Sequence, residues 1–458
     1  MSKEKINVGQ EPVYDARKLG LGKMGVLGFQ HMFAMFGATV TVPLLTGLNV
    51  QTTLLMAGLG TLLFHLLTKF KVPAFLGSSF AFLGGSAAVA PFLEDPVTGE
   101  KTVPNLEMLP YACLGVVFAG LLYLILALVI KLVGVKKVMK LFPPVVTGPI
   151  IIAIGLGLAP SAINNCAQCW PLALIALASV IAFNIWGMGM SKIIPILIGV
   201  VGAYIVALLL GNVAGLSWIS PVDTAKIADA AWIGLPVDWS GTVFGGINFG
   251  DAEKITTALT TMIPIAIATM MEHIGDVCAI GATVGKDYIN DPGLHRTLIG
   301  DGLATSLSSL FGGPANTTYG ENTGVLALSK VYDPRVVRIA AYIAVLLSFS
   351  PKFAAVISAM PVGIVGGISF VLYGMISAIG IRNMVEAHVD FTKSRNVIVA
   401  ALILVCALGI SLSSVGAISF TVAGLNISLS GLAIAALVGI ILNALFPDKD
   451  EVVDITEK

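Results

Sequence analysis

Charged residues are scarce in this sequence. Only 11% of its 458 residues are Asp, Glu, Lys or Arg, and 56% are apolar even without the 50 glycines. Soluble domains carry about a quarter charged residues. A water-soluble protein of this length could not cover its surface with so few charges, so the composition indicates a membrane protein. Acidic and basic residues balance at 26 each, so no net charge would attract nucleic acid.

Cysteine and metal-binding motifs are also scarce. The five cysteines include one close pair, Cys166 and Cys169, which is too little for a disulfide framework. No His-Glu-x-x-His motif or Ser/His pair in motif context is present, so we expect neither an enzyme nor a cofactor. Residues 1–23 are polar and lack the apolar core of a cleavable signal peptide. The first hydrophobic span is therefore expected to direct membrane insertion.

Long stretches of the chain carry no charged residue. The longest of them are 24–68, 141–191 and 396–447. A helix needs about 20 apolar residues to cross a bilayer. Dividing the runs at Gly, Pro and Asn clusters predicts an all-α polytopic membrane protein with about fourteen transmembrane segments.

The placement of charges predicts the orientation. If the N-terminus is cytoplasmic, basic groups such as 131–140 and 330–338 fall on the cytoplasmic side, together with Lys192 and the tail. Acids including Glu94, Asp95, Glu100 and Asp223 then fall outside. This is the positive-inside pattern. It predicts a multi-pass protein of the cell (plasma or inner) membrane with both termini cytoplasmic, which requires an even number of crossings.

The two halves of the chain resemble each other. Leu141–Ile150 is similar to Ala359–Ile368, and Pro73–Phe80 is similar to Pro314–Tyr319. With about seven spans per half, the second copy would be inverted, as in secondary transporters. Chance similarity among Gly- and Pro-rich apolar sequences is the alternative. The expected organisation is a cytoplasmic segment at 1–23, a first repeat at 24–212, an external loop at 213–253, a second repeat at 254–447 and a cytoplasmic tail at 448–458.

One segment in each half interrupts its apolar span. Ser78-Ser79-Phe80 and Thr317-Thr318-Tyr319 favour strands and are flanked by Gly or Pro. We expect two short strands joined to half-helices, each with unpaired backbone groups. In a membrane such groups persist only where they are buried in protein or line a polar cavity.

Several ionisable residues lie within the apolar spans, where charge by default suggests function. Glu272 and Asp276 are four residues apart and share a helix face. Two acids on one face resist ionisation, so one of them could take up a proton. A structural acid hydrogen-bonded to a backbone break is the other interpretation. Glu321 follows Gly320, which would let a ligand approach the backbone closely.

The remaining candidates are less specific. Asp301 is interpreted either as a helix cap or as a functional acid. His31 lies in the middle of the first span, where packing and function are both open. His65 is expected to be structural, and His273 is expected to point away from the face of Glu272.

Five stretches resemble the nucleobase/ascorbate (xanthine/uracil) permease family, and most closely its bacterial uracil-transporting members. The resemblance covers nearly the whole chain and is carried by Gln30–Ala38, Leu76–Phe82, Glu272–Gly275, Asp291–Arg296 and Asn316–Gly324.

The resemblance implies fourteen spans as a 7+7 inverted repeat, with a core domain, a gate domain and often a homodimer. It implies proton-coupled import of uracil by alternating access. The implied substrate-binding residues are Glu272, Glu321, Phe80, Tyr319, Gly320 and Tyr373. We predict Asp276, Glu272 and His31 as the proton-coupling residues, with the proton as the coupling ion.

The chemistry of the acids agrees with uracil, because an ionised carboxylate only accepts hydrogen bonds and uracil presents two N–H donors. Purine-transporting relatives tend to have Gln at the position of Glu321, so this residue favours uracil. Asp276 weakens the prediction of uracil, since uracil permeases often have His at this position. A xanthine or uric acid proton symporter of the same family therefore remains the alternative. An anion transporter would be expected to have a basic site.

Overall fold

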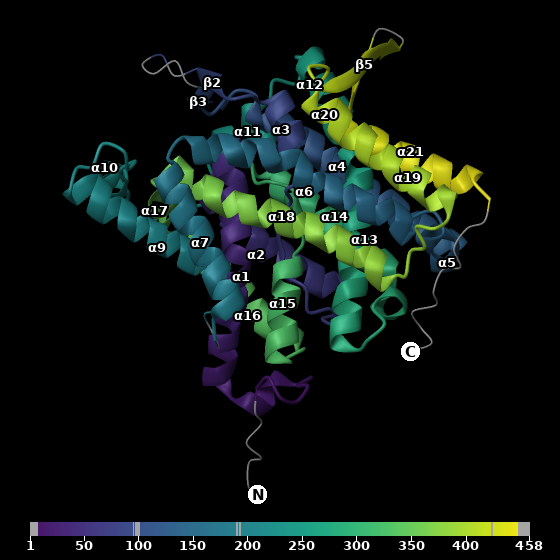
Figure 1. The fold of residues 1–458 in the computed structure, drawn as a ribbon, viewed down its shortest axis with the longest axis horizontal. Coiled ribbons are helices and arrows are strands. Elements are labelled where there is room, and N and C mark those ends of the chain that lie inside the picture. Colours follow the sequence, from purple (N-terminus) through teal and green to yellow (C-terminus); the bar gives the residue numbers. More distant parts are fainter. Residues whose placement is uncertain are drawn as a thin grey trace, which may run out of the picture.

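A computed structural model describes residues 8–94, 96, 101–188, 191, 194–422 and 425–447, and the chain is mostly helical (Figure 1). Lys192, Asp95, Glu100 and the tail from Asp448, which entered the prediction of orientation, lie outside these residues. Within the described part, eight helical spans are long and apolar enough to cross a membrane. They are α1 (Leu21–Thr46), α2 (Val50–Leu67), α4 (Leu109–Val133), α6 (Pro144–Ala167), α9 (Pro195–Val206) with the π-helix η2 (Ala207–Val213), α12 (Ala252–Met262) with α13 (Ile265–Val284), α18 (Val362–Glu386), and α19 (Ser394–Leu404) with η5 (Val405–Gly409) and α20 (Ile410–Leu412).

Other apolar helices are bent or shorter. The pair α16 (Pro334–Ser348) and α17 (Pro351–Ser358) forms one candidate span with a bend of 91°. Helices α7 (Trp170–Trp186) and α21 (Gly431–Leu445) fall just below 18 residues. The prediction of a helical multi-pass membrane protein is confirmed, whereas fourteen spans remain a prediction.

The other elements of the described residues are further helices, of which α14 is the longest, and three two-stranded sheets. They are η1 (Ala16–Leu19), α3 (Leu83–Val89), α5 (Val135–Met139), α10 (Thr224–Asp229), η3 (Trp239–Gly241), α11 (Val243–Gly246), η4 (Ile289–Gly293), α14 (Leu294–Leu310), α15 (Gly320–Ser329), β1 (Leu76–Ser78), β2 (Leu93–Glu94), β3 (Lys101–Val103), β4 (Asn316–Thr318), β5 (Ala417–Val422) and β6 (Leu425–Ser430). The sheets pair β1 with β4, β2 with β3 and β5 with β6.

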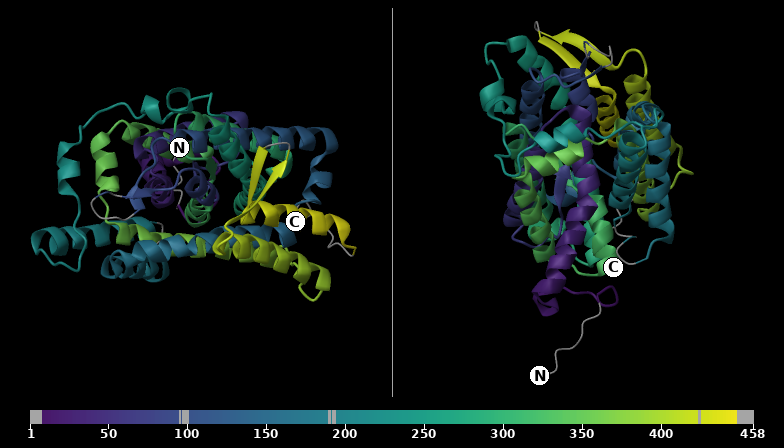
Figure 2. Two further views of the ribbon diagram at one scale, coloured as in Figure 1. Left: turned by 90° about the horizontal axis from the view of Figure 1, so that it is seen from above. Right: turned by 90° about the vertical axis from the view of Figure 1, so that its left-hand side faces the viewer.

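The helices form two layers (Figure 2). One layer, which we call the bundle, contains α1, α2, α4 and α12 to α16. The other, which we call the slab, contains α6, α7, α9, α18, α19 and α21. The β1–β4 pair is held in the bundle, since β1 contacts α1 and α2 while β4 contacts α13 and α14.

Packing partners recur between the halves of the chain. Helix α4 packs on α14, and α16 packs on α2; likewise α7 packs on α9, and α19 packs on α21. The two slab helices α6 and α18 pack on each other. Both begin immediately after a proline N-cap, Pro143 and Pro361, which lie in the two sequence stretches that resemble each other.

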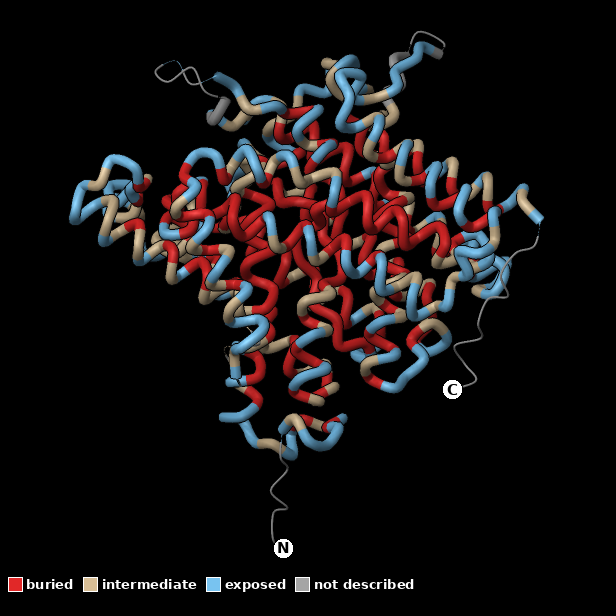
Figure 3. Tube along the Cα trace, in the orientation of Figure 1, coloured by how far each residue is buried: buried red, intermediate tan, exposed pale blue. Residues whose placement is uncertain are grey.

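Buried residues gather in the middle of the molecule, and the residues at its periphery are mostly exposed (Figure 3). Large apolar side chains on the slab are also exposed, including Leu209, Val405 and Ile441. Exposed apolar surface of this kind marks contact with another apolar medium. On a helix of this hydropathy, that medium is lipid.

The slab helices α6 and α18 approach closely through glycines. A Cβ atom at Gly380 would lie 2.6 Å from the carbonyl oxygen of Gly148 and 2.8 Å from the backbone nitrogen of Ile152. Small residues let membrane helices pack backbone to backbone. Gly374, on the same helix α18, has no atom within 4 Å of its Cβ position.

This contrast predicts opposite effects for two alanine substitutions in α18. Gly380→Ala should lower stability by about 1–3 kcal/mol, because the methyl group meets backbone that cannot move aside without separating the helices. Gly374→Ala should be neutral or slightly stabilising, since alanine favours the helix. Thermal unfolding of both variants in the same detergent measures the difference. Equal melting temperatures would contradict this packing.

The N-terminal segment is docked on the loop between α15 and α16. Val13 N donates to Lys330 O at 2.8 Å, and Tyr332 N donates to Val13 O at 2.8 Å. Ala16 N donates to Asp333 Oδ2 at 2.8 Å. Tyr14 reaches the end of α13, where its hydroxyl donates to Val284 O at 2.8 Å. The segment therefore links the ends of α13 and α15.

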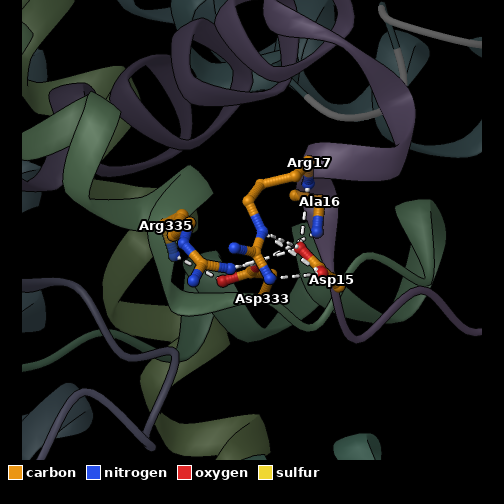
Figure 4. Close-up of polar contacts among 5 residues, drawn as sticks. All are labelled: Asp15, Ala16, Arg17, Asp333 and Arg335. Atoms are coloured by element: carbon orange, nitrogen blue, oxygen red, sulfur yellow. Dashed lines mark hydrogen bonds and ion pairs between the residues drawn. The ribbon is translucent and has the colours of Figure 1, made fainter.

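Asp15 is the centre of this docking (Figure 4). It accepts hydrogen bonds from Arg17 Nε at 2.9 Å and Arg17 Nη2 at 2.8 Å, and Arg335 Nη1 lies 3.3 Å away. The hydrogen bond from Arg17 lowers the pKa of Asp15 from 3.8 to about 2. A carboxylate whose pKa is lowered by folding stabilises the folded state at pH values above its ordinary pKa. This stabilisation is lost as the pH falls to the lowered pKa of the folded state.

We therefore expect the N-terminal segment of the wild-type protein to stay protected at pH 4 and to become cleavable by pepsin as the pH approaches 2. Asp15→Asn should be cleaved at both values, because the neutral amide cannot pair with the two arginines. Glu11→Gln, which changes an exposed acid of the same segment, is the control and should behave as the wild type. Protection of the Asp15→Asn segment at pH 4 would show that the ion pairs do not hold it.

Candidate functional site

The predicted strands are present and pair with each other. Strands β1 and β4 are antiparallel, with Gly77 opposite Thr317. Two further bonds extend the ladder, from Ser79 N to Ala315 O at 2.8 Å and from Tyr319 N to Phe75 O at 3.0 Å. Each interrupted segment thus supplies the backbone partners that the other lacks.

Side chains from neighbouring helices hold the strands in place. Thr61 of α2 accepts a hydrogen bond from Leu76 N at 2.9 Å. Thr305 of α14 donates to Asn316 O at 2.6 Å. Buried backbone polar groups in a membrane protein need such partners. The two hydroxyls therefore anchor β1 and β4 to the bundle.

Helix α15 begins immediately after β4, at Gly320. The first four amides of a helix have no partner within it and carry the positive end of its dipole. This helix start opens onto a cavity that lies where bundle and slab meet. The cavity is lined by Ser78, Phe80, Ile151, Glu272, Asp276, Thr317, Thr318, Tyr319, Gly320, Glu321, Ile376 and Ile379.

Three acids face this cavity from two helices. Helix α13 contributes Glu272 and Asp276, and α15 contributes Glu321. Thr318 Oγ1 donates a hydrogen bond of 2.8 Å to Asp276 Oδ2. Oε2 of Glu272 is buried and has no hydrogen-bond partner within the described part of the chain. The site therefore offers carboxylate acceptors to a solute that carries donors.

Aromatic residues border the acids. Phe80 lines the cavity, and the ring of Tyr373 packs edge-on against it, with centroids 5.7 Å apart and planes at 80°. Tyr373 itself does not line the cavity. The Tyr319 hydroxyl donates to Ser78 O at 3.0 Å, so this tyrosine also braces β1. Of the predicted substrate-binding residues, five face the cavity and Tyr373 supports one of them.

His31 lies beside the site rather than in it. It is fully buried in α1, and the side-chain amide of Asn322 lies 3.0 Å from its carbonyl oxygen and 3.1 Å from Nδ1. Asn322 follows Glu321 directly. His31 therefore ties α1 to the start of α15, and of the predicted proton-coupling residues only Glu272 and Asp276 line the cavity.

A second polar group lies behind the acids. His273 points away from the cavity, and its Nδ1 lies 3.1 Å from Asp301 Oδ2 and 3.5 Å from Thr318 Oγ1. The capping interpretation of Asp301 is wrong, because this residue lies in the middle of α14 and is fully buried. The expectation of a helix end came from the nearby Arg296, but α14 already begins at Leu294. His65 is structural as predicted, with Nε2 2.8 Å from Ala74 O.

The site includes residues that the sequence did not single out. Thr317, Thr318 and Ser78 were expected only as strand formers, and alternation along a strand could have placed some of them at the cavity. No sequence feature marked Ile151, Ile376 and Ile379 as site residues, since they resemble any apolar residue of a helix. In the described part of the chain, no cluster of His, Cys, Asp and Glu could hold a metal ion.

Two broken membrane segments that meet at a polar cavity are typical of a secondary transporter. A profile of the Permease family matches residues 22–416. The chain belongs to this family, and it is a membrane transporter rather than an enzyme.

Individual relatives support the family assignment, and a solved structure shares the fold. The chain is 39% identical to the uracil permease of Bacillus caldolyticus, with 96% of each chain covered. It is 37% identical to the uracil permease of Bacillus subtilis (strain 168), with 100% of this chain and 99% of the relative covered. The fold is similar to the transmembrane domain of the cyanobacterial bicarbonate transporter BicA, with a TM-score of 0.61, 15% identity, and 85% of this chain and 96% of that chain covered.

The pair formed by His273 and Asp301 yields a prediction. Asp301→Ala should destabilise the protein by about 3–5 kcal/mol, because it leaves a buried histidine without its partner. Glu386→Ala, which breaks the exposed pair between Arg382 and Glu386, should cost about 0–1 kcal/mol. Thermal unfolding in detergent compares them, and equal losses would contradict a structural role for the buried pair.

Proposed function

We propose that this protein imports uracil together with a proton. The observation that carries the proposal is that Glu272 of α13 and Glu321 of α15 face one cavity beside Phe80, which comes from the first half of the chain. Its full-length similarity to uracil permeases supports the same solute.

The hydrogen-bonding pattern of uracil suits this cavity. Its two N–H groups meet the carboxylates of Glu272 and Glu321, while its carbonyl oxygens accept from backbone amides at Phe80 and at Gly320, the start of α15. Each hydrogen bond that is missing in a dry site costs about 1–3 kcal/mol. The ring of Phe80 then packs against the flat solute.

Proton coupling is assigned to the same group of acids. Asp276 shares the helix face of Glu272 and is hydrogen-bonded to Thr318. Two carboxylates facing one cavity repel each other when both are ionised, so binding a proton stabilises the loaded site. Asp276 and Glu272 are the proposed proton carriers. His31, which contacts Asn322 beside Glu321, is proposed to respond to their charge.

We further propose that the bundle is the core domain, that the slab is the gate, and that the solute crosses by alternating access between them. Among the described residues, the slab lines the cavity with isoleucines only, so the solute has no side-chain hydrogen bond to the slab that must break when the bundle moves. Recurring packing pairs in the two halves and the antiparallel β1–β4 pair support a 7+7 inverted repeat with both termini cytoplasmic. A homodimer is part of the same proposal.

A xanthine or uric acid symporter is the second candidate. One observation favours it, namely Asp276 at a position where the resemblance leads us to expect histidine in uracil permeases. An anion transporter is disfavoured, because the residues lining the cavity are acidic and neutral. Competition between uracil and xanthine in an uptake assay separates the two solutes.

The proposed function predicts that proteoliposomes take up labelled uracil faster with an inward proton gradient than without one. Glu321→Gln should abolish uptake and uracil binding, because the amide places a donor where uracil also has a donor. Its melting temperature should stay near that of the wild type. Glu386→Gln, which changes an exposed residue that does not line the cavity, is the control. Retained uracil affinity in Glu321→Gln would refute the site.

A further inference from the structure

The two walls of the cavity differ in chemistry. The wall from the bundle carries the acids and hydroxyl groups of Glu272, Asp276, Thr317, Thr318 and Glu321. The wall from the slab consists of isoleucines, with Ile151 on α6 and Ile376 and Ile379 on α18. Within the described part of the chain, the slab wall therefore offers no side-chain hydrogen bond to a solute.

The isoleucines are placed at different depths. Ile151 is 4% exposed and Ile376 is 9% exposed, whereas Ile379 is 38% exposed and stands at the rim of the cavity. A Cβ atom at Gly320 would lie 3.4 Å from Ile379 Cδ1. Since β-branched side chains are stiff on a helix, this wall leaves little room opposite the start of α15.

Uracil has a matching asymmetry. Both N–H groups and both carbonyl groups occupy four consecutive ring positions, and the remaining edge, C5–C6, carries only C–H groups. When the polar edge faces the bundle, the C5–C6 edge faces the slab. This orientation pairs donors with acceptors on one side and apolar surface with apolar surface on the other.

We propose that Ile151, Ile376 and Ile379 form the specificity wall, which admits pyrimidines that are unsubstituted at C5 and C6 and rejects larger nucleobases. This inference rests on the proposed function and goes beyond it by naming the residues that select the solute. Thymine places a methyl group on C5, toward the wall. Xanthine fuses an imidazole ring at that edge, and its nitrogen atoms would find no partner among isoleucines.

The test enlarges the cavity on the slab side. Thymine and xanthine compete with labelled uracil for uptake into proteoliposomes carrying the wild type, Ile376→Ala or Ile379→Ala. One methyl group in an apolar pocket discriminates about 10–200-fold. We expect the wild type to prefer uracil over thymine by at least about tenfold, and the alanine variants to reduce this preference by a similar factor. Xanthine should gain less, because its nitrogen atoms stay unpaired.

Two further variants keep the result interpretable. Ile381→Ala changes an exposed isoleucine of the same helix that does not line the cavity, and it should keep the wild-type preference. Ile379→Val removes one carbon and should give an intermediate preference even if an alanine variant fails to fold.

Equal competition by thymine and uracil in the wild type, or an unchanged ratio in all slab variants, would overturn the specificity wall while leaving uracil transport intact. Failure of the wild type to take up uracil would instead overturn the proposed function.

Discussion

The structure depends on one constraint: a backbone amide or carbonyl inside a membrane must have a hydrogen-bond partner. Two segments of this chain abandon the helix within the membrane-spanning part, and each would be costly alone. They satisfy each other as the β1–β4 pair, and hydroxyl groups of α2 and α14 complete the bonds. This pairing brings residues about 240 positions apart to one place. The cavity lies beside the pair because helix α15 can begin only where the strand ends.

The bundle and the slab contribute different kinds of side chain to this cavity. Among the described residues that line the cavity, the bundle supplies every charged group, and it keeps them in place through buried contacts such as those between His273 and Asp301 and between His31 and Asn322. The slab supplies an apolar wall and packs through glycines, with α6 against α18. In the proposed mechanism, a polar solute that is held by the bundle and covered by the slab changes sides when the two layers move against each other. The docking of the N-terminal segment adds a link between the ends of α13 and α15, the two helices that carry the acids.

Much of the site could be predicted because its chemistry is rare in a membrane sequence. Glu272, Asp276 and Glu321 stand out as acids within apolar runs, and Phe80 and Gly320 stand beside recognisable interruptions. Asp301 was harder, since an acid near a basic cluster reads equally well as a helix cap. Its role became clear only when His273, from another helix, was found beside it. The isoleucines of the specificity wall could not be recognised, because an apolar residue that lines a cavity has the same sequence pattern as one that faces lipid.

The sequence by itself determined the solvent, the helical class and the presence of two broken segments, because hydropathy, proline, glycine and β-branched residues act locally. It also marked the acids, since the energetic cost of charge in lipid is a property of each residue. Only the tertiary structure decided which atoms meet. The pairing of β1 with β4, the contact of Thr318 with Asp276 and the approach of Ile379 to Gly320 each join segments that are distant in sequence. Such contacts follow from how helices pack, and no local pattern in the chain records them.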